Sequence, residues 1–164
     1  NFTGHKGAYF GPSMELGQKF HMLESTYGKD VDAFLRECDK AWDGYGTGTK
    51  MIKCHQFAYS LGWLRRNVSN ANILLVKRGY HECFDWWKQA GGWDITYPDY
   101  KWYVDDNHMQ HYIEAENKLA AEFVSRRADW EPFTERWLSL TLGPHNIKQE
   151  PEKYADVEVA IVNL

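Results

Sequence analysis

The chain of 164 residues is long enough for one ordinary domain or a short array of small repeats, and its 43% hydrophobic content excludes wholesale disorder. Its 19 basic and 23 acidic residues leave a net charge of −4, which argues against a dedicated nucleic-acid binder. No apolar run approaches the ~20 residues of a membrane span, and the unusual feature is an aromatic load of 8 Trp, 10 Tyr and 8 Phe.

Helical periodicity organises the first half of the chain. Residues 1–12 hold three glycines and a proline and are expected to form an irregular leader. Ser13 is a suitable N-cap for a helix that ends at Gly28, and Asp30 is a suitable cap for a second helix reaching Trp42. A glycine-rich loop at 44–49 then leads to a third helix. The apolar positions that support these three helices are Leu16, Phe20, Leu23, Val31, Phe34, Leu35, Cys38, Ile52, Phe57, Leu61 and Leu64.

The second half also predicts mostly helix. A fourth helix begins at Ser69 or Asn70, passes Lys77, and either continues or breaks at Gly79 before the segment HECFDWWKQA. The glycine pair Gly91–Gly92 is a stop signal. The remaining predicted helices are 98–104, a long one capped by Asp106 or Asn107 that reaches about Ala128, and a last one that opens at Glu131–Pro132 and ends at Gly143–Pro144.

The C-terminal tail differs from the rest. Val157, Val159 and Ile161 alternate with Glu158 and Ala160, which predicts one β-strand in an otherwise helical chain. A lone strand cannot satisfy its backbone groups. We therefore expect residues 144–164 to be an extended tail that docks on the sheet edge of a partner, with a flexible tail as the alternative.

Three cysteines, Cys38, Cys54 and Cys83, form no CxxC motif and fit neither a disulfide framework nor a zinc site. We expect three buried or half-buried thiols in a reducing compartment. The chain begins with Asn1 and not Met, so either the sequence is trimmed or a targeting segment has been removed, of which a cleaved organelle presequence is the more interesting option.

One helix carries the best candidate metal ligands. Asp105, His108, His111 and Glu114 follow one another at steps of three, and histidine with carboxylate at helical spacing holds metals in bundle cores. A di-iron site needs two Glu-x-x-His pairs, however, and the chain has none. A wet, charged helix face is the favoured interpretation, and we predict no metal, no cofactor and no catalytic residue.

Other catalytic and phosphate-binding patterns fail on their spacing. In the loop from Gly44 to Lys50 a threonine separates Gly48 from the lysine, so it does not match a phosphate-binding G-x-x-x-x-G-K-[ST] loop. Cys54 and His55 are adjacent, so on a helix they point about 100° apart and cannot pair as nucleophile and base. We expect no small-molecule ligand.

Three basic doublets leave two interpretations open. Arg65–Arg66, Lys77–Arg78 and Arg126–Arg127, with aromatic residues nearby, could form an RNA-binding stripe. They serve more often as solvated helix ends or as anchors in protein interfaces, where Trp, Tyr and Arg are enriched. The neighbouring Trp86–Trp87 and Trp93 exceed what one helix face can bury, so part of this load is expected between helix pairs or against another protein.

The segment from His81 to Asp105 resembles the repeat junction of pentatricopeptide proteins. The residues in comparable places are Cys83, Phe84, Trp87, Gly91, Gly92, Asp94, Thr96, Tyr97 and Tyr100. In size and helix layout the whole chain is similar to a pentatricopeptide-like family of small extra subunits on the catalytic head of euglenozoan (kinetoplastid) mitochondrial ATP synthase. This resemblance implies a non-catalytic protein that packs outside an α subunit, on the matrix side of the inner membrane, without binding RNA or inserting into the membrane.

The sequence thus predicts an all-α fold of antiparallel helix pairs, stacked as a pentatricopeptide-like array of about seven helices over residues 13–143. The favoured function is a non-catalytic subunit of a larger complex. The alternatives are an organellar pentatricopeptide-type RNA-binding protein and a helical metal-binding enzyme that uses His108, His111 and Glu114.

Overall fold

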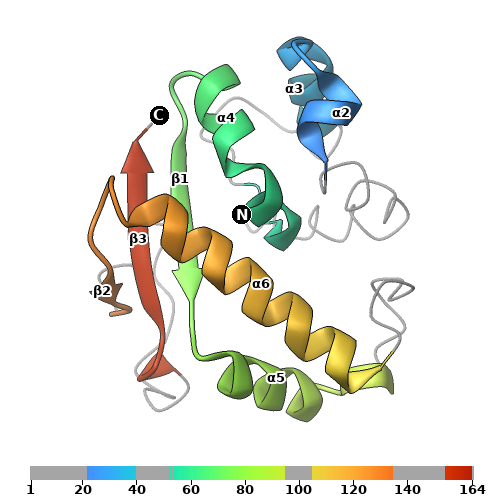
Figure 1. Cartoon of the computed structure of the whole chain (residues 1–164), viewed down its shortest axis with the longest axis vertical. Coiled ribbons are helices and arrows are strands. Elements are labelled where there is room, and N and C mark those ends of the chain that lie inside the picture. The colour runs from blue at the N-terminus through green and yellow to red at the C-terminus, as the bar shows by residue number, and fades with distance from the viewer. Residues whose placement is uncertain (1–21, 40–51, 53, 95–104, 135–153, 164) are drawn as a thin grey trace, which may run out of the picture.

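A computed structural model describes residues 22–39, 52, 54–94, 105–134 and 154–163. Over these ranges the chain combines five α-helices with one three-stranded antiparallel sheet (Figure 1). The predicted leader, the glycine-rich loop 44–49 and the predicted helix 98–104 lie outside the described residues.

The helices begin and end largely where local signals predict. The Asp30 carboxylate accepts the Ala33 N–H at 2.9 Å and so caps α3, and Gly28 ends α2 with a positive φ of 56°. Positive φ angles at Gly91 and Gly92 follow α5 and explain why glycines stand there. The α-helices are α2 (Leu23–Tyr27), α3 (Val31–Asp39), α4 (Leu61–Asn67), α5 (Tyr80–Gln89) and α6 (Asp106–Val124). Two 3₁₀ segments, η3 (His55–Ser60) and η4 (Gly92–Asp94), accompany them.

The sheet has the strand order β1 (Asn72–Lys77), β3 (Glu158–Asn163), β2 (Glu131–Pro132). In the long β1–β3 pair, Leu75 lies opposite Ala160 and Ile73 opposite Val162. These four residues belong to the main core cluster together with α6 side chains, so this face of the sheet packs against the helices. Figure 1 shows α6 crossing the sheet diagonally, with α5 below it and α2 and α3 at the far side of α4.

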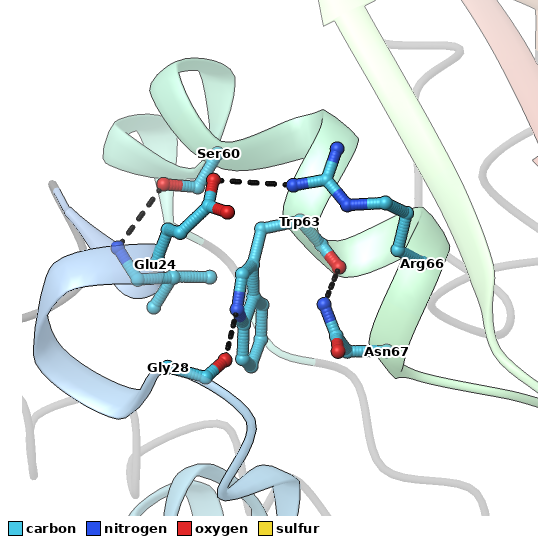
Figure 2. A network of polar contacts seen from close by, with 7 residues as sticks. Glu24, Gly28, Ser60, Trp63, Arg66 and Asn67 are labelled. Carbon is cyan, nitrogen blue, oxygen red and sulfur yellow. Dashed lines mark hydrogen bonds and ion pairs between the residues drawn. The ribbon is translucent and has the colours of Figure 1, made fainter.

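A small polar network fixes α2 against α4 (Figure 2). The indole N–H of the buried Trp63 donates to the Gly28 carbonyl at 2.7 Å, and the Leu23 N–H donates to the Ser60 hydroxyl at 3.2 Å. At the surface, Arg66 pairs with Glu24 at 3.1 Å. Because Leu23 is fully buried beside these bonds, the network holds the N-terminal helices onto the main core.

The predicted all-α, seven-helix array is wrong, because residues 72–77 form β1 and not the fourth helix. The run Ile73–Val76 suits a buried strand as well as a helix, and two of its four residues are β-branched. Asn70, with a φ of 60°, lies in the turn between α4 and this strand. Pairing with β3, about 90 residues later in the chain, makes this segment a strand and not a helix.

The predicted start of the last helix is also wrong, since Glu131–Pro132 form β2 beside β3. The strand predicted around Val157–Ile161 is confirmed, as β3 over Glu158–Asn163. It is not a lone strand, however, because it lies between β1 and β2 of the same chain. The backbone groups of β3 are therefore paired within this chain, and the strand does not need the sheet of a partner protein to satisfy them.

Candidate functional site

The His–carboxylate series at the start of α6 is explained as a helix cap. The Asp105 carboxylate accepts the His108 backbone N–H at 2.8 Å and lies 3.0 Å from His108 Nδ1. These hydrogen bonds, the backbone one first, hold the pKa of Asp105 below its ordinary value. His111 and Glu114 are exposed farther along the helix. Within the described ranges no group of three His, Cys, Asp or Glu residues could hold a metal ion.

A second polar cluster, which the sequence did not single out, lies between η3 and α6. His55 Nδ1 is 2.9 Å from a carboxylate oxygen of Glu116, whose side chain is only 16% exposed. Burial, together with this carboxylate, raises the pKa of Tyr59 to about 12. His55 is thus paired with Glu116, and this contact fastens η3 to α6.

The thiols are unsuited to nucleophilic chemistry. Cys38 is buried, and Cys54 and Cys83 are half-buried, all three as free thiols, as predicted. Burial raises the pKa of both Cys38 and Cys54 to about 12 and also raises that of Cys83. Because the thiolate is the nucleophile, these thiols stay protonated near neutral pH, and Cys38 and Cys54 act as small residues of the main core cluster.

The Lys77–Arg78 doublet is tied to acidic partners and to aromatic rings within the fold. Arg78 makes two hydrogen bonds to Asp156, at 2.7 and 3.0 Å, and lies 5.6 Å from the Trp86 ring centroid. Lys77 Nζ is 2.8 Å from Glu158 and 4.5 Å from the Trp130 ring centroid. These two cations brace the end of the sheet and do not form a free phosphate-binding stripe.

Part of the aromatic surplus is used in the same way. The Trp87 and Trp93 rings meet edge to face with centroids 4.9 Å apart, and the Trp93 indole donates to Asp106 at 2.6 Å. Trp87 also packs against a small hydrophobic cluster between α5 and α6, whose buried residues are Phe84 and Met109. The expectation that some aromatic residues pack between helices is therefore confirmed for this group.

The sheet exposes an apolar face on the side away from the helices. Leu74 pairs with Ile161, and Val76 pairs with Val159, so alternation puts these four side chains on the face opposite the Leu75–Ala160 pair. Val159 is fully buried, whereas Val76 is 55% exposed and Ile161 37% exposed. We call Leu74, Val76 and Ile161 the outer sheet patch. Exposed apolar side chains such as Val76 and Ile161, next to the half-buried Leu74, are typical of binding surfaces.

The two edges of the sheet are unlike. The β2 edge is two residues long and carries Pro132, which has no N–H to offer. The β1 edge is six residues long and contains neither Pro nor Gly. On the side away from β3, the backbone of β1 makes no backbone hydrogen bond to any residue in the described ranges. Toward the rest of the described chain, this edge therefore presents N–H and C=O groups that have no backbone partner.

The sequence analysis did not find the outer sheet patch or the β1 edge, because it predicted a helix for residues 70–77. The only available signal was the four-residue apolar run Ile73–Val76, which fits a buried strand as well as a helix. The loop Gly44–Lys50, whose spacing does not match a phosphate-binding loop, lies outside the described residues.

Comparisons with known proteins identify no relative: no family model, no curated protein and no solved structure matches this chain. In the part of the chain that the structure describes, no helix is long and apolar enough to cross a bilayer.

Proposed function

We propose that this protein is a non-catalytic subunit of a larger protein assembly and that it docks through the outer sheet patch. The observation that carries the proposal is the exposure of Val76 and Ile161 beside Leu74 on neighbouring strands. A partner that covers these side chains removes apolar surface from water, which is the main favourable term in protein association.

The chemistry of the described residues favours binding over catalysis. The three thiols have raised pKa values, and the most closely packed His–carboxylate contact, His55–Glu116, joins two structural elements. A pentatricopeptide-type RNA-binding role has lost its structural basis, because it requires stacked helical repeats.

The specific partner that the sequence resemblance proposes is the α subunit of mitochondrial ATP synthase. That resemblance depended on a helical array, so only the size and composition of the chain still support it. We therefore propose the class of function, a docking subunit, and treat ATP synthase as the first complex to look for.

The test is affinity purification of the tagged chain under mild conditions, with mass spectrometry and stoichiometry of the proteins that come with it. We expect partner subunits in a fixed ratio that resists nuclease. The variant Ile161→Lys, which puts a charge in the outer sheet patch, should lose them. The matched control is Leu35→Lys on α3, where a leucine that is 41% exposed lies outside the sheet.

Equal recovery of the partners with Ile161→Lys would contradict docking through this patch. Recovery of RNA with its processing factors, lost on nuclease treatment, would contradict the proposed class and support an RNA-binding role. Recovery of ATP synthase α and β subunits in fixed ratio would identify the complex.

A further inference from the structure

We propose that the free edge of β1 pairs with the same edge of a second copy of this chain, so that two three-stranded sheets become one continuous sheet. This inference rests on the proposed function in taking the sheet as a docking surface, and it names the occupant of the edge. The strand order across the dimer would be β2-β3-β1, then β1-β3-β2 of the second copy.

The β1 edge lacks, in its own sequence and register, the features by which edge strands commonly prevent such pairing. These features are central charges, prolines, bulges or very short length. β1 has six residues, all six paired in register with β3, and its single charge, Lys77, is at its last position. Lys77 is already held by Glu158 at 2.8 Å, so it does not guard the edge. The opposite edge, in contrast, is closed by the short β2 with Pro132.

The sequence of β1 is complementary to itself in the antiparallel direction. With Leu75 opposite its own copy on the two-fold axis, Leu74 lies opposite Val76 of the second copy, and Ile73 lies opposite Lys77. In this register, residues that lie opposite each other point to the same face of the combined sheet. Leu75 of both copies therefore stays on the core face, and Leu74 and Val76 stay on the outer face. No like charges are opposed, and apolar pairs occupy the centre.

Charge separation favours the same arrangement. In this register the two Lys77 residues are offset along the strands by four residues, about 13 Å at ~3.3 Å per residue. That exceeds the screening length of about 10 Å at 0.1 M salt, so their repulsion is small. The dimer also doubles the outer sheet patch, because Val76 of each copy adjoins Leu74 of the other. The enlarged patch remains available to the larger partner.

The experiment is sedimentation equilibrium or size-exclusion chromatography with light scattering, on the full chain from about 1 to about 100 µM. We expect the mass to rise from that of one chain to that of two. Val76→Lys should weaken dimerisation by at least about tenfold, because it brings two charges near the two-fold axis. Val76→Thr, which keeps a β-branched side chain without charge, should change the constant by less than about threefold.

Two further measurements separate pairing from general destabilisation. Far-UV circular dichroism of Val76→Lys should match that of the parent chain, since the residue is 55% exposed, and Leu35→Lys should dimerise normally. Amide hydrogen exchange within Asn72–Lys77 should slow as concentration rises, because pairing protects edge N–H groups.

A single-chain mass at about 100 µM would overturn the inference, and so would a dimer unaffected by Val76→Lys. Neither result would overturn the proposed function, which is tested by partner recovery with Ile161→Lys, a substitution on the central strand and not on the edge. Conversely, a β1-dependent dimer that recovers no partner would support the inference and contradict the larger assembly.

Discussion

Replacing Trp63 by Phe tests whether α2 and α4 are held together as the structure shows. The Trp63 side chain is 3% exposed, its ring lies edge to face with Phe34 at 5.3 Å, and its N–H donates to the Gly28 carbonyl (Figure 2). Trp63→Phe removes that donor and leaves space beside the smaller ring. Gly28 is exposed, so water can partly replace the indole, and the lost hydrogen bond costs about 1 kcal/mol.

The packing lost in Trp63→Phe adds to this loss of unfolding free energy. Truncating a buried Trp or Phe to Ala costs about 3–5 kcal/mol, and Trp→Phe removes a fraction of that volume, which suggests about 1–2 kcal/mol. The total loss of unfolding free energy is therefore about 2–3 kcal/mol. At a urea slope of about 1–3 kcal/mol/M, the urea midpoint should fall by about 0.7–3 M with the slope unchanged.

The matched control is Trp93→Phe. This indole also donates a hydrogen bond, to Asp106, but its residue is 37% exposed, so we expect a loss below about 1 kcal/mol. A Trp63→Phe cost no larger than the Trp93→Phe cost would refute the reasoning, because burial is the property that distinguishes the two sites.

Three other substitutions test local features. The Tyr27 hydroxyl is buried and has no hydrogen-bond partner among the described residues, and burial raises its pKa to about 12. Tyr27→Phe should therefore leave the unfolding free energy unchanged or raise it by up to about 1 kcal/mol, and a clear loss would reveal a partner. The pKa of Asp105 is lowered in the folded state, so its stabilisation is complete above its unfolded pKa and is lost as pH falls through the folded value. Asp105→Asn keeps a cap and should flatten that part of the acid unfolding curve; an unaltered curve would contradict a charged cap. Phe84→Ala should cost about 3–5 kcal/mol in urea unfolding, against about 0.5 kcal/mol for the exposed neighbour Asp85→Ala, and equal costs would place Phe84 outside the core.

The sequence predicted features that depend on neighbouring residues. The cap at Asp30, the helix end at Gly28 and the stop at Gly91–Gly92 follow from hydrogen bonds and φ angles confined to a few residues. The cap of the long helix α6 was predicted one or two residues late, at Asp106 or Asn107 and not at Asp105, and its end about four residues late. The helix itself was visible because 19 helical residues sustain a clear period. The strand near the C-terminus was visible from alternation alone.

The candidate site could not be predicted, because it exists only as a strand pair. Leu74 and Ile161 are 87 residues apart in sequence and lie opposite each other in the sheet. Nothing local in Asn72–Lys77 shows that a partner strand is available, so its apolar run was interpreted as helix. The same partner overrode the helix-start signal at Glu131–Pro132.

The sequence by itself therefore determined most of the helix boundaries, three buried or half-buried free thiols and the existence of one strand. Only the tertiary structure decided that a second apolar segment joins that strand, that helices and a sheet are combined, and that an apolar patch is exposed beside a sheet edge with no backbone partner in the described ranges. The physical reason is that helical hydrogen bonds close within four residues, whereas the hydrogen bonds of a sheet join segments that the chain brings together only when it folds.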